Sequence, residues 1–442
     1  MAATSGIVTQ PLAQPVYDPA VRLVNFFNGR MLSAEDLSAE QTANREERRR
    51  LGQVLGAGIA YGLEVKPTDG VDPKAAAAVT VSAGLALNRQ GQTLSLAQRV
   101  DLALHDLPTT DTGSTADIRD FAFCSDGSGN AYVAGAGLYL LTIGTAEGKQ
   151  GLAPVSGLGN VQASCNTRYL APGVRFRLVR LTLEPTDLNQ PALLRNRLAY
   201  RCLAAAPEGS DGLVDDAFFA NPFGPPISAY GVIDRLRPQL PTALGNAAWL
   251  RECEVPLALL YFTADDGLVF VDMWAVRRRI VAPGADAVFP LLTGDRRRAE
   301  GEAMFLQFQD QIAKMRLDGE PLPTVAARDR FVFLPPVGLL PIGTDSQPLG
   351  FKYDTFFSGM AYRDPIFIEG AQLRPLVQEA INYPPIDTGS SVVVWLYLVR
   401  ENAQLTLTGK PAQSYLVFAS GHTPYRGEAR YNVHHWNFGN FA

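Results

Sequence analysis

Residues 24–37 read VNFFNGRMLSAEDL, and this stretch predicts how the fold begins. Ser33 followed three residues later by Asp36 is a close relative of the capping box that starts a helix, with Asp in place of the usual Glu or Gln. Glu35 and Asp36 fall in the expected first turn, where acidic groups oppose the positive end of the helix dipole. We therefore predict a helix from Ser33 to Arg50, preceded by a short aromatic hook.

The predicted helix lacks the apolar stripe of a helix that faces a core. Residues 38–50 contain only two apolar positions, Ala39 and Ala43, far short of an i, i+3, i+4, i+7 recurrence. The arginine run 48–50 is expected in the last turns, where cations are favoured. A helix that is polar on all sides bridges other elements or contacts another chain. An exposed helix held by ion pairs four residues apart stays open as the alternative.

Composition indicates a multi-domain protein with many turns. The chain has 442 residues, which at about 150 residues per domain predicts two to three domains. Apolar residues make up 47% and charged residues 19%, both globular values, while 40 Gly and 31 Pro favour short strands over long helices. The net charge of −5 argues against a nucleic-acid binder, which normally needs a basic surface.

No segment predicts a secretory signal or a membrane span. Residues 1–14 lack a basic region followed by an apolar one, and the longest apolar run, 392–399, has the length of a strand. The cysteines are far apart and form no CxxC pair, which predicts buried free thiols at Cys124, Cys165, Cys202 and Cys253. We therefore expect synthesis and assembly in the cytoplasm.

Four regions are expected along the chain. Residues 1–57 form an N-terminal arm and a docking helix, and residues 58–290 form one or more β-rich domains with an excursion at about 207–241. A helix is expected within 291–320 and a C-terminal β domain over 321–442. The predicted fold class is mainly β with a few helices, in which the arm and charged helix precede multiple sandwich or barrel-like β domains.

Local patterns predict the main elements inside these regions. Short alternating runs between 56 and 96 predict a β meander. Longer strands are expected at 138–143, 174–183, 255–263 and 268–274, the last two joined as a hairpin by an Asp-Gly turn. Residues 320–348 are rich in proline and predict an irregular wall between domains. Helical spacing over 296–316 predicts an apolar seam, for core packing or alternatively for a partner, made by Phe305, Phe308, Ile312 and Met315.

No motif indicates catalysis, a cofactor or a metal. The glycines of 56–62 and 144–149 miss the spacing of nucleotide-binding loops. Adjacent His434 and His435 would point to opposite faces of a strand and so could not easily chelate one ion. Residues 126–130 lack the acidic density of a calcium loop. We expect no catalytic residues, no cofactor-binding residues and no metal ligands.

The tail 425–442 mixes aromatic rings with Asn residues. Rigid amphipathic rings with small polar neighbours suit either sugar stacking, with Trp436 as a candidate, or a protein interface. A final strand that closes the C-terminal domain is an equally good interpretation.

Residues 25–37, with Glu40, Gln41 and the arginine-rich stretch before Gly56, resemble the N-terminal signature of proteins associated with contractile injection systems, which are phage-tail-like particles. That signature runs as aromatic, Asn, Gly, Arg, and then a helix that begins Ala-Glu-Asp. Further runs fit the same pattern at 62–65, 84–87, 255–258, 270–272 and 334–341.

The resemblance implies a non-enzymatic structural subunit at or around the baseplate. Its implied partners are other baseplate, spike or sheath-proximal subunits in a multi-copy symmetric assembly, without nucleic acid or a transmembrane segment. The particle would be assembled in the cytoplasm and then released or docked on a membrane. A fibre-like subunit that recognises cell surfaces or carbohydrates is the alternative. Docking is expected through Phe26, Phe27, Asn28, Arg30, Leu32, Asp36, Glu40 and Gln41.

Overall fold

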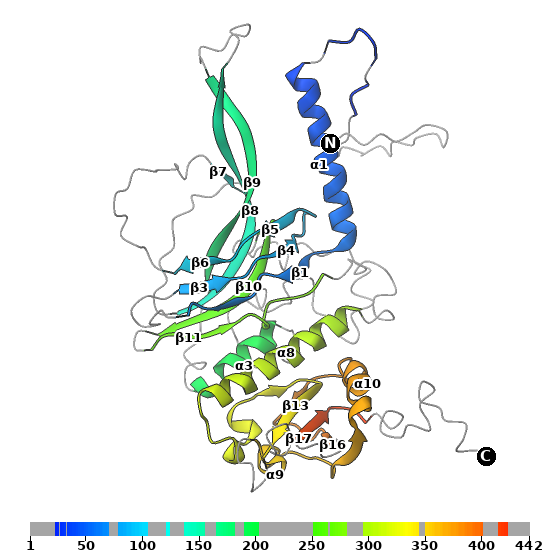
Figure 1. The fold of residues 1–442 in the computed structure, drawn as a ribbon. Coiled ribbons are helices and arrows are strands. Elements are labelled where there is room, and N and C mark those ends of the chain that lie inside the picture. The colour runs from blue at the N-terminus through cyan, green and yellow to red at the C-terminus, as the bar shows by residue number, and fades with distance from the viewer. Residues whose placement is uncertain are drawn as a thin grey trace, which may run out of the picture.

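The computed structural model describes residues 23–25, 27–31, 33–69, 78–104, 121–123, 137–154, 165–181, 190–202, 251–263, 266–280, 295–343, 350–400 and 414–422. Within these ranges the protein is mainly β, with 41% of residues in strands and 29% helical, spread over several small sheets. This agrees with the predicted class. Figure 1 shows a body from which a helix and a β hairpin project on one side. None of the described helices is both long enough and apolar enough to cross a membrane.

Helix α1 (Ala34–Leu55) begins where the sequence predicts. The Ser33 Oγ accepts a hydrogen bond from the Asp36 N–H, and the Asp36 carboxylate accepts one from the Ser33 N–H, which completes the capping box. The predicted end at Arg50 is wrong, because the helix continues through Gly52 and ends at Gly56, whose φ of 88° favours glycine. The arginine run therefore lies inside the helix and not in its last turn.

Six short strands follow α1 and form two three-stranded sheets, not the single meander that was predicted. The first sheet has the order β1 (Gly58–Gly62), β4 (Gly84–Leu87), β5 (Thr93–Leu96), and the second has the order β2 (Val65–Pro67), β3 (Ala78–Val81), β6 (Val100–Ala103). Positive φ angles at Gly62 and Leu63 redirect the chain between β1 and β2. Leu63, Val79 and Leu94 are fully buried in the core that both sheets share.

The central sheet holds the longest strands. Its order is β11 (Gly267–Asp272), β10 (Glu254–Thr263), β8 (Gly137–Pro154), β7 (Phe121–Phe123), and β9 (Cys165–Leu181) also pairs with β8. Strands β10 and β11 form the predicted hairpin, with Thr263 opposite Gly267. The β8–β9 ladder runs from Leu138 opposite Leu181 out to Pro154 opposite Cys165, well beyond the two predicted strands.

Helix α8 (Asp295–Leu317) lies between the central sheet and the C-terminal region (Figure 1). Phe308, Ile312 and Met315 are buried in the C-terminal core. Ala303 and Met304 of the same helix belong to a second core with α3 (Pro191–Cys202) and the central sheet. The predicted apolar seam is therefore used for packing inside this chain.

The main C-terminal sheet is covered by helices and differs from the suggested sandwich. Its order is β13 (Val337–Ile342), β17 (Ser414–Ala419), β16 (Trp395–Arg400), β14 (Ile366–Glu369), with β14 parallel to β16. A helix that was not predicted, α10 (Gly370–Ala380), follows β14 in the connection between these parallel strands. Strand β13 occupies a stretch that was expected to be irregular. Its Pro341 is tolerated because β13 lies at the sheet edge.

Short elements complete the C-terminal region. They are the 3-10 turns η3 (Leu322–Thr324) and η4 (Ala327–Asp329), the helix α9 (Tyr353–Phe356), and a two-stranded sheet of β12 (Phe333–Leu334) and β15 (Ile386–Asp387).

The expectation of buried free thiols holds for one of the described cysteines. Cys202 is a buried thiol. Cys165 is an exposed thiol at the outer end of β9, and Cys253 forms a disulfide. Cysteine spacing could not predict either outcome. The exposure of Cys165 and the disulfide of Cys253 both depend on how the fold arranges residues that are far apart in the sequence.

Candidate docking surface

The hook, defined as the described residues 23–25 and 27–31, is fastened to α1 by Arg30. The Arg30 guanidinium donates to the Asn25 carbonyl oxygen and to an Asp36 carboxylate oxygen, each at 2.6 Å. Its central carbon also lies 5.9 Å from the centre of the Phe27 ring. The Arg30 N–H donates to the Phe27 carbonyl oxygen at 3.2 Å, so a tight turn returns the chain toward the helix.

Asp36 is the centre of this arrangement. Its carboxylate accepts hydrogen bonds from the Ser33 N–H at 3.1 Å and from the Ser33 hydroxyl at 3.2 Å, in addition to the bond from Arg30. The Ser33 backbone hydrogen bond is the main reason why the pKa of Asp36 is lowered, and the positive charge of Arg30 adds to the effect. The residue is therefore held as a carboxylate near neutral pH.

The predicted docking residues divide into fastened and exposed ones. Arg30, Asp36 and Glu40 are fastened, since a Glu40 carboxylate oxygen accepts a hydrogen bond from the Val24 N–H at 3.4 Å. Three others point into solvent: Phe27 is 63% exposed, and Asn28 and Gln41 are also exposed. The remaining two, Phe26 and Leu32, lie outside the described residues.

In the part of the chain that the structure describes, helix α1 contacts the body along its second half. Of its 22 residues, Ala43 and Gly52 are buried. A Cβ on Gly52 would collide with the Gly91 carbonyl, and a Cβ on Gly91 would collide with the Arg49 carbonyl, so two glycines allow the helix backbone to lie against the β4–β5 turn. The Arg49 side chain adds a hydrogen bond to the Gln90 carbonyl at 3.4 Å.

A second projecting element, which the sequence did not predict, is the outer part of the β8–β9 hairpin. We call residues 149–154 and 165–170 the β-arm, because they continue the ladder beyond the last residue of β8 that pairs with β7. Both faces are largely exposed, including Leu152 at 71%, Tyr169 at 56% and Leu170 at 50%. At about 3.3 Å per residue, six residues per strand extend the arm by about 20 Å.

Helix α1 and the β-arm extend from the same part of the body and run in roughly the same direction (Figure 1). An ion pair of 3.9 Å between Arg45 and Glu147 joins the helix to β8 just below the arm. We call the two projecting elements together the fork. Both prongs point to the same side of the molecule, away from the C-terminal region.

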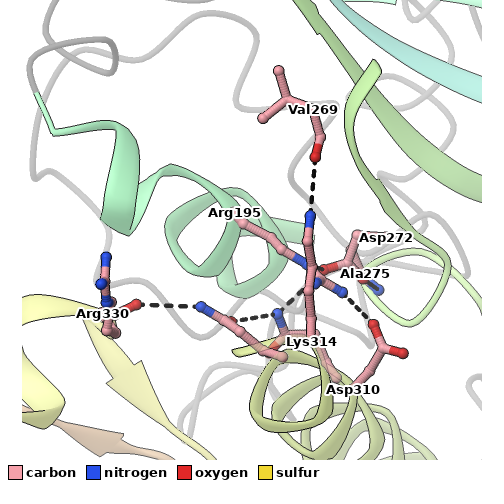
Figure 2. A network of polar contacts seen from close by, with 9 residues as sticks. Arg195, Val269, Asp272, Ala275, Asp310, Lys314 and Arg330 are labelled. Atoms are coloured by element: carbon pink, nitrogen blue, oxygen red, sulfur yellow. Dashed lines mark hydrogen bonds and ion pairs between the residues drawn. The ribbon is translucent and has the colours of Figure 1, made fainter. Parts of the chain in front are cut away.

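A buried polar network between α3, β11 and α8 is the strongest competing site (Figure 2). The Arg195 guanidinium bridges the carboxylates of Asp272, at 2.7 Å, and Asp310. Burial alone would lower the pKa of Arg195, but the two carboxylates raise it above the ordinary arginine value. Burial and the charge of Arg195 lower the pKa of Lys314, which donates to the Val269 carbonyl at 3.0 Å.

The same network connects the central sheet to the C-terminal region. Gln307 donates to Asp272 at 3.2 Å, and Gln311 donates to the Arg330 carbonyl at 3.4 Å (Figure 2). Nearby, the Asn196 side chain receives hydrogen bonds from the N–H groups of Val332 and Phe333 and donates to the Phe333 carbonyl. Every charged group here is matched to a partner, so the network works as a structural connection between elements.

The other sequence candidates for chemistry have structural roles or fall outside the described ranges. Residues 144–149 lie within strand β8 and therefore cannot form a phosphate-binding loop. The His422 ring stacks on the Trp395 ring with 4.1 Å between centres. Among the described residues no group of three or more His, Cys, Asp or Glu side chains could hold a metal ion. Outside the description lie 126–130, the excursion 207–241, the tail 425–442, His105, His434 and His435.

One feature of this surface was found from the sequence, and two could not be. The cap at Ser33 was found, and the matched glycines at 52 and 91 were overlooked because glycine within a helix pattern signals a close approach only when its partner is known. The β-arm depends on pairing between distant residues. No protein-family model matches the chain, and no curated protein has a matching sequence.

Proposed function

We propose that this protein is a non-enzymatic structural subunit of a phage-tail-like contractile injection system, located at or around the baseplate and docked through the hook and α1. The observation that carries the proposal is that the hook is ordered by local contacts and yet remains exposed. Arg30 ties Asn25 and Asp36 together, while Phe27 is left 63% exposed beside them. A partner would meet a surface that loses little conformational entropy on binding.

The length and polarity of α1 also support docking on another chain. Most of its surface is exposed, and its contacts with the described body, made by Arg45, Arg49 and Gly52, lie in its second half. A helix that buries almost nothing gains little stability from its own chain. Contact with neighbouring baseplate, spike or sheath-proximal subunits would cover it, and a symmetric assembly would repeat this contact in every copy.

The direct test is co-purification of a tagged full-length chain with the particle from producing cells. The double variant Phe27→Ala/Gln41→Ala removes two exposed side chains of the docking surface. It loses the ring contact of Phe27 with Arg30 but keeps the Arg30 hydrogen bonds to Asn25 and Asp36. We expect its amount in the particle to fall at least tenfold while its unfolding transition stays unchanged. The matched control is Leu317→Ala, which truncates a side chain that is 87% exposed at the end of α8, far from the hook.

Two results would contradict the proposal. One is wild-type occupancy of the particle by the double variant, and the other is an equal loss with the Leu317 control. Deleting residues 1–50 extends the test to the whole segment, and the described β sheets should remain folded in that variant because their cores contain no residue from that range.

A further inference from the structure

The outer half of α1 and the β-arm carry opposite charge. Residues 33–44 of the chain, which cap and begin α1, contain three acidic residues, Glu35, Asp36 and Glu40, and no basic ones. The β-arm contains two basic residues, Lys149 and Arg168, and no acidic ones. Lys149 and Arg168 are both exposed, as is Glu35. Surfaces of opposite sign attract and orient one another during association.

Each prong also exposes apolar side chains next to its charges. Leu37 of α1 is 52% exposed and lies between the acidic residues. On the arm, Leu170 is 50% exposed and lies opposite Lys149 in the ladder. Because side chains alternate between the two faces of a strand, Arg168 shares this face, whereas Tyr169 and Leu152 lie on the other face. The Arg168 guanidinium stacks over the Tyr169 ring at 5.0 Å. Both surfaces therefore combine a charge with an apolar contact area.

An isolated two-stranded ribbon is at best marginally stable in water. Among the described residues the β-arm has no third strand, since the pairing of β7 with β8 ends at Gly148. No described helix covers the arm either. The prongs of one molecule do not cover each other along their outer parts. The ion pair of Arg45 with Glu147 and the approach of Gly52 to Gly91 fix the base of the fork, and within the described ranges no hydrogen bond or ion pair joins residues 33–44 to the β-arm.

We propose that the acidic half of α1 in one copy of this chain packs against the basic β-arm of the next copy, in a head-to-tail contact. This inference rests on the proposed function, because it supplies the contact by which copies of a multi-copy subunit neighbour one another. A head-to-tail contact uses two different surfaces of each copy, and its repetition builds a ring where the rotation closes and a filament where it does not. A second copy of this chain therefore covers the β-arm, and the acidic residues of its α1 neutralise the basic residues of the arm.

Charge reversal on the full-length chain tests the contact. The helix variant is Glu35→Lys/Glu40→Lys, and the arm variant is Lys149→Glu/Arg168→Glu. Each variant alone places like charges at every contact, so we expect its self-association, measured by sedimentation at low ionic strength, to weaken at least about tenfold. In an equimolar mixture, copies of the two variants that alternate have opposite charges at every helix-to-arm contact, and we expect association close to that of the wild type.

The mixture separates a contact between copies from one within a copy, because mixing cannot repair an intramolecular contact. The control is Lys66→Glu/Arg99→Glu, which changes the net charge as much as the arm variant at two exposed positions elsewhere. Recovery in the mixture with an unaffected control supports the inference. Absence of wild-type association, failure of the mixture to recover, or an equal loss in the control overturns it.

The exposed Cys165 at the arm gives a second readout inside the particle. Ser38→Cys places a thiol on the exposed acidic half of α1, and a short bismaleimide should then join one chain to the next, but not when Cys165 is replaced by Ser. If the chain is present in the particle without this cross-link, the inference fails and the proposed function stands. If the chain is absent from the particle, the proposed function fails, and sedimentation of the purified chain still decides the inference.

Discussion

The C-terminal core and the fork are built in opposite ways. The core gathers six fully buried rings whose neighbouring centres lie 5.0 to 6.2 Å apart: Phe308, Phe331, Phe351, Phe356, Phe357 and Phe418. The described residues of the fork contain no cluster of buried rings. In α1 two residues are buried, and along the β-arm most side chains lie in solvent.

This difference separates residues that determine folding from residues that are available for contact. Apolar burial stabilises the core, whereas the fork is held by local polar contacts and by a backbone approach between two glycines. Changes in the core should therefore unfold the protein, and changes in the fork should alter contacts while the body stays folded.

The largest expected effect comes from removing a core ring. Phe308→Ala takes away a ring that contacts both Phe331 and Phe418, at 5.2 and 5.3 Å between centres, and leaves a cavity. We expect the free energy of unfolding to fall by about 4 kcal/mol. Urea unfolding followed by circular dichroism measures it. Phe27→Ala, the same substitution at an exposed ring of the hook, should change the free energy of unfolding by less than about 0.5 kcal/mol. Similar decreases in the two variants would refute the contrast between the core and the fork.

A somewhat smaller decrease in the free energy of unfolding is expected when the Arg195 guanidinium is removed from the buried network. Arg195→Met leaves the carboxylate of Asp272, which is 1% exposed, without its ion pair. We expect a cost of about 3 kcal/mol, at the low end for a broken buried pair, because Gln307 and the Ala275 N–H still donate to Asp272. Adding Asp272→Asn removes the buried charge and should recover part of the loss in the same urea assay. No recovery would show that packing and not charge determines the effect.

Local signals predicted local structure correctly. The start of α1 depends on Ser33 and Asp36, three residues apart, and the β10–β11 hairpin depends on adjacent turn residues, so a short window contained the information. The seam of α8 was visible for the same reason, since residues three or four apart share a helix face. The mainly β class followed from composition alone.

Pairing between distant residues was not predictable in this way. Glycine at 148 and 151 and proline at 154 and 172 resemble loop residues, but the register with β9 carries both strands through them. The sorting of six strands into two sheets, and the approach of Gly52 to Gly91, likewise depend on partners far along the chain. The docking residues of the hook were singled out through a family resemblance, and their Arg30 to Asp36 pairing became visible only in three dimensions.

A test at the base of the fork should give an intermediate effect. Gly91→Ala adds strain at a φ of +76° and pushes a Cβ into the Arg49 carbonyl, so we expect a cost of about 1–3 kcal/mol. The loss should appear as faster amide exchange in the second half of α1, with the C-terminal sheet unchanged. Gly29→Ala is the matched control, because its φ is +90° but nothing lies within 4 Å of the added Cβ. Equal effects of the two variants would mean that strain alone, without the collision, explains the result.

The smallest expected effect is the pH dependence of the cap of α1. Because the pKa of Asp36 is lowered in the folded protein, its carboxylate stabilises the hook and the first turn above the ordinary value of about 3.9, and this contribution is lost as the pH falls through the lowered value. The protection of the amides of residues 34–37, taken relative to their intrinsic exchange rate at each pH, should fall below about pH 4, and Asp36→Asn should show the lower protection at every pH. The C-terminal core provides the internal reference, because Phe308 and Phe418 are buried there and do not contact Asp36 or the hook. A first turn equally protected above and below the lowered pKa would show that Arg30 and Asp36 do not hold the docking surface in place.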